Sequence, residues 1–169
     1  MTRILGAVLT AGVCAWIGDR RARQLKCRVD TLDSLITALR GMERELADCL
    51  TPLPRLVERM TDCTTTPVRS LFQGAKRALE RLEEEEFSAA WGRMAQEIPD
   101  LEREDRRIVC SLGGVLGRYD GRRQGEAVAR ACRELERNRE QADQDFRRLG
   151  RVYRTVGAVC GGFLLILLL

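Results

Sequence analysis

The sequence predicts an all-α fold, and three observations support this. Aromatic residues make up only 5% of the 169 residues, so a core must be built mostly from Leu, Val, Ala and Met. The chain has only four prolines, and its charged residues (32%) are typical of helical proteins. Apolar residues recur every three or four positions over long stretches, without a strand pattern. We therefore expect a bundle of about six helices, in which long first and last helices run antiparallel and extend into apolar terminal segments.

The first segment, residues 1–18, is predicted to be a transmembrane helix. Its run from Ile4 to Gly18 has no charged side chain, and a spanning helix needs about 20 residues. A cleaved signal peptide is an alternative, but an A-x-A site is lacking and two arginines follow the run. A lipoprotein signal would use Cys14, which follows the bulky Val13. We favour a retained helix.

The last segment, residues 151–169, is predicted to be a second transmembrane helix. From Gly157 to Leu169 it has no charged side chain. Gly157 and Gly161 lie four residues apart, on one face of a helix, and such spacing allows close packing with another membrane helix. The sequence leaves open whether the two anchors pair within one chain or between chains of a homo-oligomer.

Basic residues flank the inner end of both apolar segments, whereas the outer ends carry only Arg3. Nine residues form these flanks: Arg20, Arg21, Arg23, Lys26, Arg28, Arg147, Arg148, Arg151 and Arg154. By the positive-inside rule, residues 19–150 face the cytosol and both termini point away from it. The predicted membrane-interface anchors are Arg20, Arg21, Arg23, Arg151 and Arg154.

The flanking residues also account for the net charge of +4. Without these nine, Arg3 and Asp19, the chain keeps 19 basic and 24 acidic residues, a net charge of −5. The basic excess therefore lies beside the predicted membrane, where it suits anionic lipid headgroups. Acids alternate with bases elsewhere, and no interleaved aromatic residues could stack on bases, so no nucleic-acid partner is expected.

Two apolar stripes predict the long helices of the cytosolic helical bundle, residues 19–150. Each stripe alternates steps of four and three residues, a coiled-coil-like period. The first consists of Leu25, Val29, Leu32, Ile36, Leu39, Met42, Leu46 and Leu50. The second consists of Val128, Cys132, Leu135, Arg139, Ala142, Phe146, Leu149 and Tyr153, of which Arg139 alone does not fit. We expect the two helices to pack against each other, each running into its own membrane segment.

Between these two long helices, two shorter helices are predicted to begin with a threonine followed by a proline. In TPLPRLVERM (Thr51–Met60) and at Thr66-Pro67, a threonine suited to capping precedes a proline. Proline is tolerated at the first helical position because its missing N–H would have no partner there. We expect helices to begin at Pro52 and Pro67.

Two further helices are expected before the long last helix. Phe87, Trp91 and Met94 share a helical face that ends where Pro99 interrupts it, and another helix includes Ile108 and Leu112. After it, Gly117 is suited to a left-handed stop. Asp120 is suited to capping the final helix.

No pattern of catalytic or metal-binding residues is present, so we expect no enzyme activity, cofactor or metal. The absence of histidine removes the commonest general base and metal ligand. The seven cysteines are scattered and none forms C-x-x-C, which argues for reduced thiols. No Lys-Ser/Thr follows Gly113-Gly114, which argues against a phosphate loop.

Glu83, Glu84, Glu85 and Glu86 form the most conspicuous charge run. Consecutive helical residues point to different sides, so the run is a poor metal site. It is either a solvated helix end or an electrostatic docking site for a basic partner. We treat these four glutamates as candidate partner-binding residues.

Four stretches follow one another in a characteristic order: TPLPRLVERM (Thr51–Met60), PVRSLF (Pro67–Phe72), SLGGVLGRYDGRRQ (Ser111–Gln124) and RVYRTVGAVCGGFLLILLL (Arg151–Leu169). Together they resemble the stage III sporulation protein AB family of endospore-forming bacteria, over nearly the whole chain. Tyr119 departs from the family pattern, which has a small hydroxyl residue before the Asp. The resemblance adds Asp120 and Gln124, the Asp and Gln of the third stretch, to the candidate partner-binding residues.

The family is similar to the platform protein of type II secretion and type IV pilus systems. The resemblance implies a non-catalytic platform of the sporulation channel between mother cell and forespore, located in the mother-cell membrane around the forespore. By this analogy, the protein would couple a cytosolic secretion-type ATPase to the other channel subunits. A membrane-tethered helical regulator or scaffold, unrelated to an ATPase, is the alternative.

Overall fold

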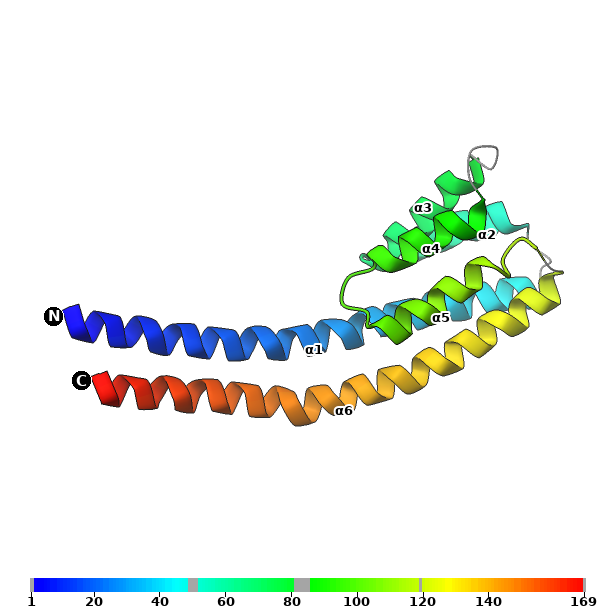
Figure 1. Cartoon of the computed structure of the whole chain (residues 1–169). Coiled ribbons are helices and arrows are strands. Elements are labelled where there is room, and N and C mark those ends of the chain that lie inside the picture. The colour runs from blue at the N-terminus through cyan, green and yellow to red at the C-terminus, as the bar shows by residue number, and fades with distance from the viewer. Residues whose placement is uncertain (1, 49–51, 81–85, 119, 169) are drawn as a thin grey trace. The chain divides into compact units, whose positions relative to one another are not determined.

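The computed structural model describes residues 2–48, 52–80, 86–118 and 120–168. Side chains are described except at 1–12, 14–15, 18, 47–51, 81–85, 119, 150–151, 153–154, 157–158 and 160–169. Within the described ranges there are six helices and no strand (Figure 1). They are α1 (Thr2–Asp48), α2 (Leu53–Cys63), α3 (Val68–Glu80), α4 (Phe87–Glu97), α5 (Arg103–Gly113) and α6 (Gly121–Leu168). The predicted all-α fold, with long first and last helices, is confirmed.

The chain divides into two compact units. The terminal unit consists of Met1–Val29 and Glu140–Leu169, and the central unit consists of Asp30–Arg139. This division follows packing within the chain. The predicted boundaries after residues 18 and 150 concern a membrane, and the structure does not test them.

In the central unit, α1 and α6 pack antiparallel through the predicted apolar stripes. Leu32, Leu39 and Met42 of α1 and Val128 and Leu135 of α6 are all fully buried. Two ion pairs join the helices, from Asp33 to Arg139 (2.9 Å) and from Arg40 to Glu136 (2.6 Å). From the first ion pair to the second, the residue number increases on α1 and decreases on α6. The two helices therefore run in opposite directions, and the predicted antiparallel pairing is confirmed here. Arg139, the misfit of the second stripe, is the partner of Asp33.

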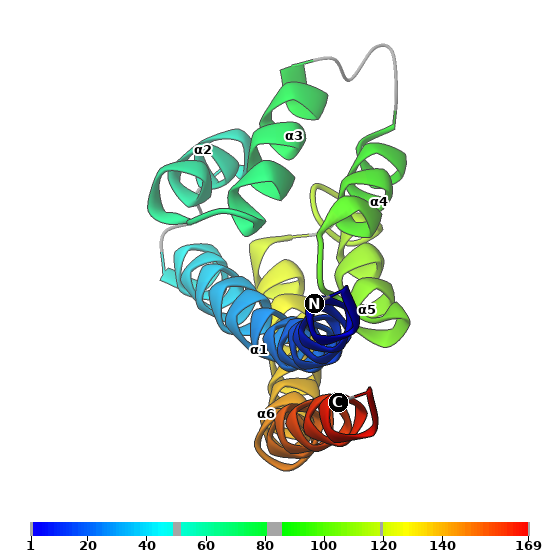
Figure 2. The same cartoon turned by 90° about the vertical axis from the view of Figure 1, so that its left-hand side faces the viewer.

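The short helices of the central unit pack in chain order, α2 on α3, α3 on α4 and α4 on α5. Figure 2 shows α3 between α2 and α4. Trp91 of α4 is fully buried among them, with its ring 6.1 Å from that of Phe72 and 5.9 Å from that of Phe87. Its indole Nε1 donates a hydrogen bond to the carbonyl oxygen of Val109 (2.8 Å). A buried indole N–H needs such a partner, and this one connects α4 to α5.

Helices α2 and α3 begin one residue later than we expected. Pro52 has an extended ψ of 139°, so it precedes α2, and Thr51 lies outside the described residues. Pro67 likewise precedes α3, which starts at Val68. Helix α4 ends at Glu97, two residues before Pro99, because a residue that precedes proline disfavours the helical conformation.

The connection from α5 to α6 contains both predicted signals. Gly117 has a φ of +81°, the left-handed conformation that glycine adopts without strain, although α5 itself ends earlier, at Gly113. The side chain of Asp120 accepts a hydrogen bond from the backbone N–H of Arg123 (3.3 Å), so it caps α6.

Asp105 is a fully buried carboxylate at the start of α5. One oxygen accepts a hydrogen bond from the backbone N–H of Glu102 (3.0 Å), which precedes the helix. The other accepts one from the side-chain amide of Asn138 on α6 (2.8 Å). A single side chain therefore both caps α5 and connects it to α6.

In the terminal unit, the outer parts of α1 and α6 lie side by side with the two termini at the same end (Figure 1). Among the side chains described there, several large apolar ones are exposed: Val13, Trp16, Ile17, Leu149, Val152, Val156 and Val159. Within the described part of the chain, no helix contains a stretch that is both long and apolar enough to cross a bilayer. Most side chains of the two predicted spans lie outside the described residues, and both spans stay predictions.

Candidate functional site

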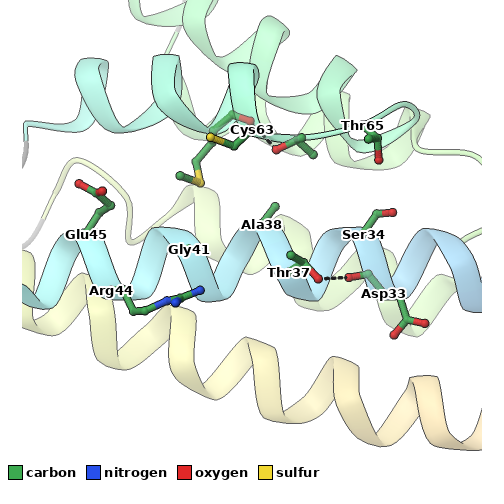
Figure 3. Close-up of a pocket in the computed structure, with 11 residues that line it drawn as sticks. Asp33, Ser34, Thr37, Ala38, Gly41, Arg44, Glu45, Cys63 and Thr65 are labelled. Atoms are coloured by element: carbon green, nitrogen blue, oxygen red, sulfur yellow. Dashed lines mark hydrogen bonds between the residues drawn. The ribbon is translucent and has the colours of Figure 1, made fainter.

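A groove of about 650 Å³ lies in the central unit between α1 and the end of α2 (Figure 3). We call it the α1–α2 groove. The residues that line it on α1 are Asp33, Ser34, Thr37, Ala38, Gly41, Arg44 and Glu45. Those from α2 and the turn after it are Met60, Cys63, Thr64 and Thr65. The α1 residues span thirteen positions, or twelve steps along the helix, so the groove follows that helix for about 18 Å.

Small side chains on α1 create this groove. Ser34, Ala38 and Gly41 are spaced four and three residues apart, on a helix face next to the buried apolar stripe. A Cβ added to Gly41 would lie 3.5 Å from the sulfur of Met60, in ordinary van der Waals contact. Because the side chains at these three positions are small, the space between the helices stays open beside them.

The charged groups at the ends of the groove are held by other parts of the central unit. Asp33 pairs with Arg139, and Glu45 pairs with Arg59 of α2 (2.7 Å). Thr37 donates its hydroxyl hydrogen to the carbonyl oxygen of Asp33 (2.8 Å; Figure 3). Arg44 also lines the groove, and its guanidinium donates a hydrogen bond to a backbone carbonyl oxygen one turn earlier on α1 (3.2 Å). The floor between these charged side chains is small and uncharged.

Arg69 of α3 fixes the end of α2 that borders the groove. Its guanidinium donates hydrogen bonds to the carbonyl oxygens of Thr61 (3.1 Å) and Thr64 (2.9 Å). The last carbonyls of a helix have no partner within it, and a basic side chain there also suits the helix dipole. The position of Cys63, Thr64 and Thr65 along the groove thus depends on Arg69.

The side chains in the groove suit packing against another molecule. Among the described residues, no three His, Cys, Asp or Glu side chains come close enough to hold a metal ion.

The described thiols differ in their surroundings. The Cys63 thiol is exposed in the groove. Burial raises the pKa of the Cys132 thiol to about 11, with Glu43 contributing. Burial also raises the pKa of the Cys110 thiol, so both interior thiols stay protonated near neutral pH.

The predicted partner-binding residues are not gathered at this groove. Glu83, Glu84 and Glu85 lie outside the described residues, and Glu86 is exposed just before α4, where it pairs with Arg118. Asp120 is exposed and caps α6. Gln124 is buried on the first turns of α6, with 8% of its surface exposed. Their role in binding is untested by the structure.

The predicted membrane residues lie in the terminal unit. Arg20, Arg21 and Arg23 are exposed on α1, and Arg23 pairs with Asp19. The side chains of Arg151 and Arg154 lie outside the described residues, as do the surroundings of Gly157 and Gly161.

The α1–α2 groove was not predicted from the sequence. The signal that could have indicated it is the row of Ser34, Ala38 and Gly41, because small residues at helical spacing leave room beside a helix. Such a row often packs against a neighbouring helix. Only the position of α2 in the structure shows that the space beside Ser34, Ala38 and Gly41 stays open.

Three comparisons relate the chain to known proteins. The family model described as stage III sporulation protein AB matches residues 3–169. Stage III sporulation protein AB of Bacillus subtilis (strain 168) is 24% identical over 172 aligned positions, which cover 100% of both chains. A solved structure of stage III sporulation protein AB (SpoIIIAB) superimposes with a TM-score of 0.59 at 23% identity, covering 69% of this chain and 93% of that one. The structural likeness shows a shared helical fold.

Proposed function

Because the chain belongs to the stage III sporulation protein AB family, we propose that it is a non-catalytic platform of the sporulation channel between mother cell and forespore. In this role it couples a cytosolic secretion-type ATPase to the other membrane subunits of the channel. The family match over residues 3–169 is the observation that carries the proposal, since it covers all but the first two residues of the predicted anchors and the whole helical region between them.

The proposal includes two membrane anchors, residues 1–18 and 151–169, in the mother-cell membrane around the forespore. Residues 19–150 then face the cytosol. The basic residues beside both segments support this orientation. The exposed apolar side chains of the terminal unit also support a membrane location, since large exposed apolar patches mark interaction sites.

The α1–α2 groove is the surface that we assign to the ATPase. Its length of about 18 Å corresponds to three turns of a helix, so a helix of the partner could pack along it. The small floor at Ala38 and Gly41 allows close approach of such a helix. The run Glu83–Glu86, with Asp120, remains the proposed electrostatic part of the contact. Gln124 is uncharged and buried, so we assign it no electrostatic role.

Retention of the ATPase by the full-length chain tests this proposal. We expect the chain, purified in detergent, to retain the cognate secretion-type ATPase on an affinity resin. Thr37→Trp places a large ring in the groove from an exposed position, and it should lower this retention at least about tenfold by blocking a central contact. Gln73→Trp is the matched control, since Gln73 is exposed on α3 and does not line the groove.

Two results would count against the proposal. If the wild-type chain retains no ATPase at either low or high salt, the coupling role fails. Equal retention by Thr37→Trp and wild type would exclude the groove as the contact. Crosslinking that captures a channel subunit without any dependence on the ATPase would support the scaffold alternative.

A further inference from the structure

A second cavity, of about 340 Å³, lies on the terminal unit along one face of α1. Trp16, Ile17, Arg20, Arg21 and Gln24 line it, and we call it the headgroup pocket. These residues lie on successive turns of one helix face, with the apolar pair nearer the N-terminus and the two arginines about one turn further along. The surface therefore changes from apolar to cationic within a short distance.

The apolar end of the pocket is open to its surroundings. Trp16 is 58% exposed, and Ile17 and Val13, on the same face, are each 52% exposed. The other helix of the terminal unit has a similar row, in which Val152 and Val156 are about half exposed. Large apolar side chains in this number on one unit are unusual for a surface that faces only water.

The cationic end of the pocket holds two arginines in defined positions. The Arg20 guanidinium lies 5.5 Å from the centre of the Trp16 ring, in a cation–π contact. Arg21 donates a hydrogen bond to the side-chain oxygen of Gln24 (3.4 Å). The nearby carboxylate of Asp19 is bonded to Arg23. Arg20 and Arg21 therefore bring positive charge to the pocket while both side chains are already oriented.

The geometry points to an anionic phospholipid of a bilayer as the occupant of the headgroup pocket. Its phosphate would bind between Arg20 and Arg21, because guanidinium groups match phosphate oxygens in charge and geometry. Its acyl chains would pack on Ile17 and Val13, and Trp16 would lie at the boundary, where tryptophan is enriched in membrane proteins. Nucleic acid offers phosphate but no aliphatic surface for Val13 and Ile17.

This inference rests on the proposed membrane location of α1 and adds a preference for one class of lipid. A general attraction between basic residues and anionic membranes is spread over the whole surface. The pocket instead predicts that anionic lipid is enriched beside Trp16 itself. Each arginine near an anionic surface strengthens the binding of anionic lipid by about fivefold. Loss of both Arg20 and Arg21 should therefore weaken the binding of anionic lipid at the pocket by roughly 25-fold.

Fluorescence quenching by brominated lipid can test this, because the chain has only two tryptophans. Trp91 is fully buried in the central unit, so a quencher in the bilayer reports on Trp16. The full-length chain is reconstituted in phosphatidylcholine vesicles that contain the same small fraction of either brominated phosphatidylglycerol or brominated phosphatidylcholine. We expect clearly stronger quenching by brominated phosphatidylglycerol, and loss of that difference in the double variant Arg20→Gln/Arg21→Gln.

Arg122→Gln/Arg123→Gln is the matched control. It removes the same charge from two exposed arginines at the start of α6, and it should keep the preference. Equal quenching by the two lipids in the wild-type chain would overturn the inference, as would an unchanged preference in Arg20→Gln/Arg21→Gln. An oligonucleotide that displaces the lipid from Trp16 would assign the pocket to nucleic acid instead.

The outcomes separate this inference from the proposed function. A chain that does not float with vesicles at all refutes the membrane location on which both depend. A chain that shows the lipid preference but retains no ATPase keeps the inference and refutes the coupling role. A chain that retains the ATPase and binds both lipids equally would support the proposed function and refute the assignment of anionic lipid to the headgroup pocket.

Discussion

Replacement of Asp105 by alanine should be among the most destabilising single changes in the central unit. The carboxylate is fully buried and accepts hydrogen bonds from the backbone N–H of Glu102 and the amide of Asn138. The first is a helix-capping bond, worth about 1 kcal/mol. The second joins a charged acceptor to a neutral donor, worth about 2 kcal/mol. We therefore expect Asp105→Ala to lower the free energy of unfolding by about 3 kcal/mol.

Thermal unfolding of the full-length chain, followed by tryptophan fluorescence, measures this effect because Trp91 reports on the central unit. For a chain of this size, a loss of about 3 kcal/mol corresponds to a decrease in Tm of roughly 6–12 °C. Glu104→Ala is the control, since Glu104 is the next residue but is exposed and pairs with Arg107 at the surface.

A double-mutant cycle tests the contact with Asn138 directly. If the amide and the carboxylate interact as described, Asn138→Ala should cost much less in the Asp105→Ala background than in the wild-type chain. Additive effects of the two changes would refute the proposed link between α5 and α6. A decrease in Tm for Asp105→Ala no larger than that for Glu104→Ala would refute the whole estimate.

Three further predictions concern other parts of the chain. Gly113→Ala should destabilise the central unit by about 1–3 kcal/mol in urea unfolding, because the new Cβ would lie 2.9 Å from Cδ1 of Trp91. An alkylating reagent at about pH 8 should modify the exposed Cys27 at least about tenfold faster than the buried Cys132, because the pKa of the Cys132 thiol is raised to about 11. Modification of Cys132 should accelerate as the pH rises toward 11, and peptide mass spectrometry can measure both rates. Replacing the run Glu83–Glu86 by glutamines should weaken ATPase retention at low salt and make it less dependent on salt.

Each of these has a control or a contrary outcome. Gly92→Ala is the control for Gly113→Ala, because nothing beyond its chain neighbours and its own helix backbone lies within 4 Å of the added Cβ, and alanine favours the helix. Fast modification of Cys132 at about pH 8 would mean that α6 opens readily from its neighbours. ATPase retention that is unchanged by the four glutamines would leave the acidic run as a solvated helix end.

The local features of the fold could be predicted from the sequence because each depends on neighbours in the chain. The stripe along α1 predicted the burial of Leu32 and Leu39, since helical spacing alone brings these residues to one face. Gly117 was predicted because a residue without a side chain adopts the left-handed conformation readily, and Asp120 because its carboxylate can cap the helix that follows.

The contacts between distant segments could not be predicted in the same way. Asp105 and Asn138 are 33 positions apart, and nothing in either local sequence shows that they meet. Arg139 was recognised as a misfit, but its partner Asp33 lies 106 positions away. The α1–α2 groove depends on where α2 ends relative to α1, which follows from packing and from Arg69 rather than from a motif.

The two ion pairs between α1 and α6 place their acidic residues on opposite helices, and this arrangement favours one alignment of α6 along α1. In one pair the acid, Asp33, is on α1, and in the other the acid, Glu136, is on α6. If α6 slid by about one turn, Glu136 would face Asp33 and Arg133 would face Arg40, so both attractions would become repulsions. Exposed pairs of this kind add little to the free energy of folding. Their arrangement instead penalises the shifted alignment, which the repeating apolar stripes alone would tolerate.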